Sequence, residues 1–360
     1  MDISFRRLTD AADSTPALAL AALATVLLFL FAVQLLGTST ATFADALGRV
    51  LSRVVTTDPS SLGFAWLATY VLTNGSVVAA LAISLFTTDL VSASQLYLMI
   101  AGSRLGGAGF VVVVGAVDYV QKERYSFRKA VSMGVLTFLL THSVYVPATL
   151  FGWLLLPRLQ PAFRGWSQEI GFETWTPNAF EPATVAVTRL VGGGPTFLLA
   201  LGVLFVSLNL FDRVLSAVPT EDLRRYVFQH FERRWVALGL GVLVTGATTS
   251  VAFSLGVVVP LYNRGYVKRR EILPYVLGAN LGTLFDTLVV AVVLNSSTGV
   301  AVVLTVIGTA LVVTLALMLG YDWYAGAVER TQDRILEDRR VFLAFAFTLA
   351  AVPIALLAVR

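Results

Sequence analysis

The sequence contains no cysteine and only two histidines, and charged residues make up 13% of its 360 residues. Without cysteine there is no disulfide framework, redox pair or thiolate metal site. A soluble domain normally carries about twice this charged fraction. These scarcities exclude disulfide-rich secreted scaffolds and most metal chemistry, and they indicate that water is not the main solvent of the chain.

Apolar residues are abundant, at 57%, and the mean hydropathy is +0.79. A helix needs about 20 apolar residues to cross about 30 Å of hydrocarbon. Clear candidates for such spans are 17–37, 91–117, 130–156, 184–210, 300–320 and 341–359. Further apolar stretches cover 63–86, 235–261 and 273–295. We therefore expect an all-α polytopic membrane protein whose main partner is the lipid bilayer.

The distribution of lysine and arginine predicts the orientation of these spans. Basic residues gather in 118–129, 212–234, 262–272 and 321–340, which we expect in the cytoplasm. Segment 157–183 is richer in glutamate and tryptophan and is expected outside, whereas Arg6 and Arg7 predict a cytoplasmic N-terminus. Membrane orientation thus explains the net charge of +4 without a nucleic-acid partner, and we expect a multi-pass protein of the plasma membrane.

Two apolar segments do not fit a simple crossing in this topology. Segment 63–86 would begin and end outside, and segment 235–261 would begin and end in the cytoplasm. Each is therefore predicted to be a re-entrant hairpin that enters and leaves the membrane on one side. The first hairpin dips in from the outside and the second from the cytoplasm.

The two hairpins are also related in sequence by a shift of 176 residues, the separation of Gly63 and Gly239. The same shift aligns further glycines and threonines: Thr69 with Thr245, Thr73 with Thr249, Gly102 with Gly278, and Gly106 with Gly282. Two similar units of opposite orientation are typical of inverted-repeat transporters. We expect one transporter domain over 1–360, with repeats at about 63–156 and 235–320 and charged or amphipathic cytoplasmic connectors at 211–234 and 321–340. The alternative is an ordinary helix bundle with small-residue interfaces.

The two copies resemble a known family. The second copy reads TGATTSVAFSLGVVVPL from Thr245 and GANLGTLFDT from Gly278, and the first reads TYVLTNGSVVAALAISLF from Thr69 and GSRLGGAGF from Gly102. These strings resemble the type II sodium/phosphate cotransporters, in which Thr-x-x-x-Gln-Ser-Ser-Ser on a re-entrant hairpin precedes Gly-Ala-Asn-Ile-Gly-Thr-Thr. The resemblance implies two inverted repeats, each with a re-entrant hairpin and a broken transmembrane helix. It also implies symport of phosphate with Na⁺, both bound between the hairpins.

The chain departs from the family motif at the Gln-Ser-Ser-Ser positions. The first copy has Thr73-Asn74-Gly75-Ser76 there and the second has Thr249-Ser250-Val251-Ala252, so both glutamines are replaced. This leaves open a transporter of the same fold for another small anion or with proton coupling, and a non-transporting membrane scaffold or regulator. A membrane enzyme is not expected, because no nucleophile, base and metal ligands gather at one edge. The oligomeric state has no signature in the sequence.

Small polar residues near the breaks are the candidate ligands. Helix N-termini suit an anion, whereas hydroxyl and carbonyl oxygens suit Na⁺, the one coupling ion that we expect. The candidates for substrate or ion binding are Thr69, Thr73, Asn74, Ser76, Arg104, Thr245, Thr249, Ser250, Asn280, Thr283 and Asp286. Among them Thr249, Ser250 and Asp286 are the candidate Na⁺ ligands. The alternative for each serine or threonine is a bond to its own helix backbone.

Charged residues at membrane depth are costly and are functional candidates. Arg104 aligns with Asn280 at the glycine-rich break, and a guanidinium suits an oxyanion. Asp286 follows the second break and suits Na⁺ or a proton. The alternative is that Arg104 and Asp286 neutralise each other. His142, in a predicted span, is either a proton site or a hydrogen-bonded structural residue.

Overall fold

The computed structural model describes residues 15–122, 127–171, 179–217, 231–263 and 267–360. Helices account for most of the residues in these ranges, which contain no strand. Seven of their helices are long and apolar enough to cross a membrane: 16–42, 93–113, 131–170, 193–216, 269–293, 297–319 and 339–357. The chain is therefore an all-α polytopic membrane protein, as its composition predicts.

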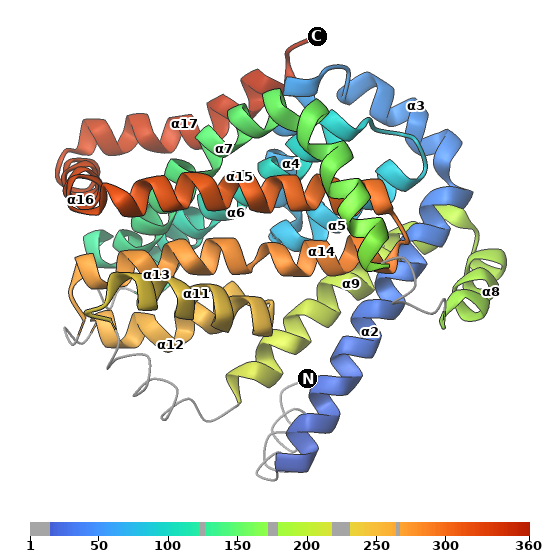
Figure 1. The fold of residues 1–360 in the computed structure, drawn as a ribbon, viewed down its shortest axis with the longest axis horizontal. Coiled ribbons are helices and arrows are strands. Elements are labelled where there is room, and N and C mark those ends of the chain that lie inside the picture. The colour runs from blue at the N-terminus through green and yellow to red at the C-terminus, as the bar shows by residue number, and fades with distance from the viewer. Residues whose placement is uncertain (1–14, 123–126, 172–178, 218–230, 264–266) are drawn as a thin grey trace. The chain divides into compact units, whose positions relative to one another are not determined.

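The helices form two compact units, and each is described here by itself. The first unit comprises residues 1–42 and 178–285. Its helices are α2 (Thr15–Thr42), α8 (Glu181–Val191), α9 (Gly193–Ser216), α11 (Arg234–Thr248), α12 (Val251–Asn263) and α13 (Arg269–Gly282). Helix α2 packs against α8 and α9, and α11 packs along α13 (Figure 1).

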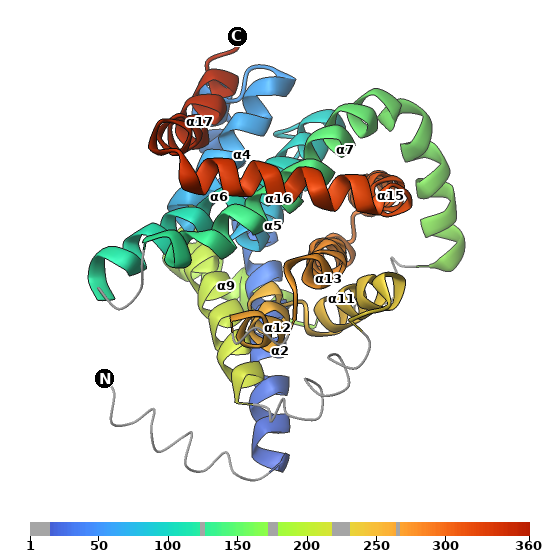
Figure 2. The ribbon, with the colours of Figure 1, turned by 90° about the vertical axis from the view of Figure 1, so that its left-hand side faces the viewer.

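The second unit comprises residues 43–177 and 286–360. Its helices are α3 (Ala44–Val54), α4 (Asp58–Leu72), α5 (Gly75–Thr87), α6 (Ala93–Lys122), α7 (Phe127–Ile170), α15 (Ser297–Leu319), α16 (Tyr321–Glu337) and α17 (Arg339–Leu357). The boundary between the units falls within α14 (Leu284–Val293), before Asp286. Helix α6 is the centre of this unit, because α4, α5, α7 and α15 all contact it (Figures 1 and 2).

Two predicted boundaries are wrong. The loop expected from residue 157 is instead helical as far as Ile170, because α7 continues through Pro157 and Pro161. A proline removes one backbone hydrogen bond, and here the helical bonds on either side carry the helix past both sites. The span expected at 184–210 is interrupted at Gly192, whose positive φ of 89° ends α8, so the apolar span begins at Gly193.

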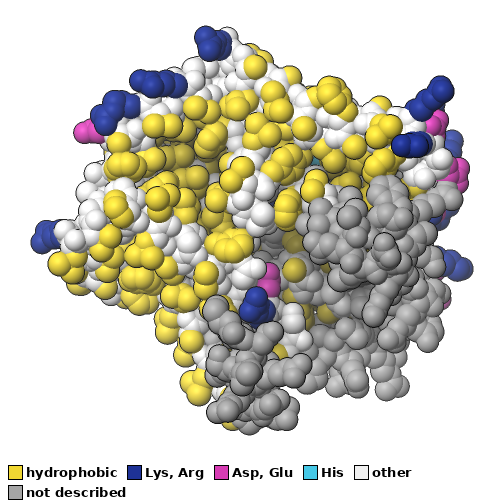
Figure 3. Space-filling view, turned by 180° about the vertical axis from the view of Figure 1, so that it is seen from behind, with side chains coloured by type: hydrophobic (Ala, Val, Ile, Leu, Met, Phe, Trp, Pro, Cys, Tyr) yellow, Lys and Arg dark blue, Asp and Glu magenta, His cyan; other side chains and the backbone are white. Residues whose placement is uncertain are grey.

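The surface of the chain is rich in apolar side chains, as Figure 3 shows for one face. Several large apolar residues are almost fully exposed, including Leu190 at 86%, Val71 at 80% and Leu319 at 77%. Apolar exposure of this extent marks a surface that meets lipid or another protein. It agrees with the membrane assignment made from helix length and hydropathy.

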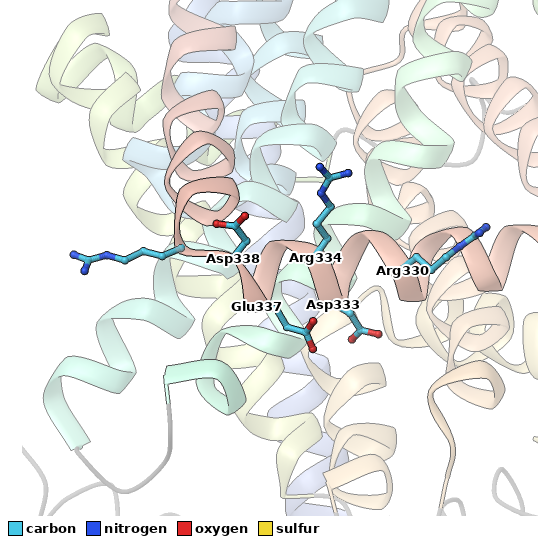
Figure 4. Close-up of a pocket in the computed structure, with 6 residues that line it drawn as sticks. Arg330, Asp333, Arg334, Glu337 and Asp338 are labelled. Atoms are coloured by element: carbon cyan, nitrogen blue, oxygen red, sulfur yellow. The ribbon is translucent and has the colours of Figure 1, made fainter.

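The predicted connector at 321–340 is mostly helical. Six charged side chains of α16 and the start of α17 line a groove of about 550 Å³ there: Arg330, Asp333, Arg334, Glu337, Asp338 and Arg339 (Figure 4). On the buried side of α16, Tyr324 shares a 2.7 Å hydrogen bond with Ser143 of α7, and burial raises the pKa of Tyr324 to about 12. The other connector, at 211–234, lies largely outside the described residues.

Candidate functional site

The first apolar hairpin of the sequence is broken between α4 and α5. Helix α4 ends at Leu72, and Thr73 adopts the left-handed conformation with φ of 55°. Asn74 is extended, and its side-chain oxygen accepts hydrogen bonds from the backbone N–H groups of Ser76 at 2.9 Å and Val77 at 3.2 Å. This capped break reverses the helix without leaving the first amide groups of α5 unsatisfied.

The second apolar hairpin is broken in the same way between α11 and α12. Thr249 is left-handed, with φ of 50°. The Ser250 hydroxyl then accepts a 2.9 Å hydrogen bond from the backbone N–H of Phe253, the third residue after it. Thr249 and Ser250 align with Thr73 and Asn74 under the shift of 176 residues. The sequence repeat therefore corresponds to a repeated backbone conformation.

Paired glycines let the following helix approach each hairpin. A methyl group on Gly102 of α6 would collide with the carbonyl oxygen of Leu62, and one on Gly278 of α13 would collide with that of Leu238. Leu62 and Leu238 are themselves equivalent under the same shift. At the next pair, a Cβ on Gly106 would come 2.6 Å from Trp66 O, and a Cβ on Gly282 would come 2.7 Å from Val242 O. Gly102 and Gly106 thus allow the close approach of α6 to α4 in the second unit, and Gly278 and Gly282 allow that of α13 to α11 in the first.

A charged cluster lies beside the first break, inside the second unit. Arg104 Nη2 donates to Thr287 Oγ1 at 2.7 Å and lies 3.5 Å from Asp286 Oδ1. The Thr287 hydroxyl donates to the same Oδ1 at 2.8 Å, and the Ser76 hydroxyl donates to Asp286 Oδ2. Helices α5, α6 and α14 therefore meet through three predicted site residues and Thr287.

The cluster is buried: Arg104 is 8% exposed, Asp286 is 3% and Thr287 is 1%. Asp286 stands in the first turn of α14, where the helix dipole favours a negative charge. The phenol of buried Tyr145, from α7, is within electrostatic range of both Arg104 and Asp286. The alternative that Arg104 and Asp286 neutralise each other agrees with this ion pair, whereas their roles in binding stay predictions.

A neutral hydroxyl cluster lies beside the second break, inside the first unit. Thr245 Oγ1 donates to Ser254 Oγ at 2.7 Å, and Ser254 Oγ shares a 2.9 Å hydrogen bond with the Tyr275 phenol. Thr245, Ser254 and Tyr275 are each fully buried. Thr69, the equivalent of Thr245, instead bonds its own helix at Ala65 O.

The remaining candidates divide between the units. In the first unit, Asn280 and Thr283 are buried at the end of α13. Thr249 and Ser250 belong to the same unit and form the break before α12. Thr73 is exposed in the second unit. The set of Na⁺ ligands formed by Thr249, Ser250 and Asp286 stays a prediction.

His142 has the surroundings of a structural residue. Its Nδ1 is 3.0 Å from Phe138 O, one helical turn earlier, and its ring stacks on the Phe138 ring with centroids 3.6 Å apart. The Trp66 ring lies on another side, at 5.4 Å. These contacts favour the interpretation of His142 as a packed residue of α7.

Thr287 and Tyr275 are the site residues that the sequence did not indicate. Thr287 follows Asp286 directly, and a threonine in a threonine-rich membrane chain carries no signal of its own. Its position next to Asp286 was the one indication of a role, because a charged group at membrane depth needs polar partners. Tyr275 aligns with Met99, so the repeat gave no reason to select it.

Residues 197–322 match the family model described as Na+/Pi-cotransporter. This match confirms the predicted resemblance. It covers the second break and Asp286, whereas the first break lies outside the matched residues. Neither the comparison with curated proteins nor that with solved structures gives a match. The Na+/Pi-cotransporter match and the seven candidate spans together support a membrane transporter of the Na⁺/phosphate type.

Proposed function

We propose that the chain is a secondary active transporter that carries inorganic phosphate with Na⁺ across the plasma membrane by alternating access. The observation that carries this proposal is the duplicated break. Thr73 and Thr249 have the same left-handed backbone conformation, and Asn74 and Ser250, 176 residues apart, have the same capping role. Discontinuous helices in repeated units are where transporters of this type bind their cargo.

In this proposal the two copies are inverted repeats, at about 63–156 and 235–320, and their broken segments are re-entrant hairpins. The support for inversion is the basic-residue pattern, which predicts that the first hairpin enters from outside and the second from the cytoplasm. The N-terminus is cytoplasmic in the same topology. Cysteine labelling tests this directly, because the chain has no native cysteine. Cysteines at Asp58 and Asp89, at the two ends of the first hairpin, should both react from outside.

The candidate residues have distinct roles in the proposal. The N-termini of α5 and α12 carry the positive ends of their helix dipoles, which suit an oxyanion, and Arg104 provides a positive charge near the first. Asp286 and the hydroxyls of Thr249 and Ser250 are oxygen ligands of the kind that Na⁺ takes. The other candidates provide further hydroxyl and amide groups: Thr69, Thr73, Asn74 and Ser76 in the second unit, and Thr245, Asn280 and Thr283 in the first.

The test is uptake of radiolabelled phosphate into proteoliposomes with an inward Na⁺ gradient or an equal K⁺ gradient. We expect Na⁺-driven accumulation by the wild type and its loss in Asp286→Asn. The matched control is Asp89→Asn, which neutralises an exposed carboxylate. Residue 89 has a positive φ, which asparagine also adopts, so this variant should fold and transport normally. Equal uptake in both gradients by folded protein would refute sodium coupling.

A second candidate function is transport of another small anion or coupling to protons. The observation that favours it is the buried Arg104–Asp286 pair, which lies beside the first break, where the motif lacks the glutamine of the family. Uptake driven by an inward proton gradient without Na⁺, or competition by sulfate but not phosphate, would support this candidate. Absence of uptake under every gradient would instead favour a non-transporting scaffold.

A further inference from the structure

In the charged cluster, the guanidinium of Arg104 and the carboxylate of Asp286 are connected mainly through a hydroxyl group. Thr287 accepts from the Arg104 guanidinium and donates to the Asp286 carboxylate, so its hydroxyl bridges the pair. The direct contact between Arg104 Nη2 and Asp286 Oδ1 is 3.5 Å, longer than the roughly 2.7–2.9 Å of a strong charge-assisted hydrogen bond. The pair is therefore neutral as a whole but is held largely through a third group.

Separating such a pair has an electrostatic consequence. A buried charge that loses its partner is strongly unfavourable, and it is tolerated only with a new counter-ion. If an oxyanion takes the Arg104 guanidinium, the Asp286 carboxylate is left uncompensated. A cation at Asp286 then restores neutrality, so anion and cation each favour binding of the other.

We propose that this chain couples its two cargoes by dividing the Arg104–Asp286 pair: the oxyanion binds Arg104, Na⁺ binds Asp286, and Thr287 holds the pair closed when both are absent. The inference rests on the proposed function, because it assumes that phosphate and Na⁺ are carried together. It adds a physical origin for their coupling and assigns Thr287 as a positioning residue.

The position of Ser76 connects this exchange to the hairpin. Its hydroxyl donates to Asp286 Oδ2 from the first turn of α5, two residues after the capping residue Asn74. A cation that takes over Oδ2 displaces this hydroxyl and removes a contact between α5 and α14. Cation binding at Asp286 therefore removes a hydrogen bond that holds the start of α5 against α14.

The test is equilibrium binding of radiolabelled inorganic phosphate to the detergent-solubilised full chain, in Na⁺ and in choline. Coupling between two sites typically changes an affinity by about 5- to 150-fold. We expect Na⁺ to tighten phosphate binding to the wild type within this range. In Asp286→Asn, where the carboxylate of Asp286 no longer competes for Arg104, phosphate should bind equally in Na⁺ and choline, although Na⁺-driven accumulation is lost.

Thr287→Val provides the finer test, because both charges remain and the bridging hydroxyl is removed. We expect phosphate to bind several-fold more tightly in choline than it binds to the wild type, with a smaller effect of Na⁺. Thr287→Ser keeps the hydroxyl and should restore the effect of Na⁺. A purely structural role of Thr287 would lower the thermal stability without changing the ratio of the two affinities.

The outcomes separate this inference from the proposed function. Na⁺-dependent phosphate binding that survives in Asp286→Asn overturns division of the pair but leaves symport intact. No phosphate binding by folded wild type in either salt overturns both. Should Asp286→Asn not fold, the charge-neutral double variant Arg104→Gln with Asp286→Asn takes its place. It should fold without binding phosphate, and Na⁺-dependent binding by it would overturn the inference.

Discussion

The two broken hairpins have the same conformation at the break but different polar groups around it. Thr73 and Thr249 are both left-handed, and Asn74 and Ser250 both cap the helix that follows. Beside the first break, however, lies a carboxylate–guanidinium pair, whereas a hydroxyl network and the carboxylate of Asp212, hydrogen-bonded to the Ser250 side chain, lie beside the second. The same local fold therefore supports two different polar environments.

This difference teaches which residues specify the shape and which specify the chemistry. The shape depends on glycines 102, 106, 278 and 282, where no side chain fits, and on the turn positions that the two copies share. The chemistry changes at positions that the repeat does not keep: Arg104 aligns with Asn280, and Ser76 aligns with Ala252. A duplicated unit can thus retain its packing while one copy acquires a pair of opposite charges.

The largest expected effect comes from breaking the charge pair of the first copy. Arg104→Gln leaves the carboxylate of Asp286 buried without its partner and should destabilise the protein by about 3–5 kcal/mol. Combining it with Asp286→Asn should recover most of this loss. Denaturation in mixed detergent and SDS measures each variant. Asn280→Ala, at the aligned position of the second copy, removes no charge and should cost less, and an equal cost would contradict the contrast.

The next effect tests the packing that the copies share. Gly102→Ala and Gly278→Ala each push a methyl group into a backbone carbonyl and should cost about 1–3 kcal/mol, as overpacking does. The control is Gly107→Ala on α6, where an added methyl group meets no described atom within 4 Å. It should be neutral or slightly stabilising, because alanine favours helix more than glycine does. Thermal unfolding in detergent compares the three, and similar midpoints would rule out close packing.

A third prediction concerns Gly63 and Gly239, which align between the two copies but have different neighbours. A Cβ on Gly63 would lie 2.6 Å from Pro353 O of α17, whereas one on Gly239 would have open space among the described residues. Gly63→Ala should therefore destabilise by about 1–3 kcal/mol. Gly239→Ala should have little effect. A large loss at Gly239 would mean that the second hairpin is also covered there.

The sequence predicted more of the shape than of the site. Glycine and threonine spacing located both breaks, because a left-handed turn and a close helix approach restrict which residues fit. It also selected Ser76, Arg104 and Asp286, which the fold brings together. It did not select Thr287, since the bridge depends on the rotation of α14 beside α6. The length of α7 was missed because the span was bounded by its apolar residues, whereas the helix continues into the more polar stretch after Leu156.

The smallest effect concerns the strain that both copies retain. A threonine with positive φ is unusual, because its branched Cβ crowds the backbone, whereas asparagine adopts this conformation more readily. Thr73→Asn and Thr249→Asn should each stabilise the protein by about 1 kcal/mol, and by similar amounts, since their φ values are 55° and 50°. Thermal unfolding measures the gain, and phosphate uptake by the same variants measures its consequence. A stabilised protein with reduced uptake would indicate that the threonine hydroxyl is used for binding, whereas unchanged uptake would confine the role of both residues to the turn.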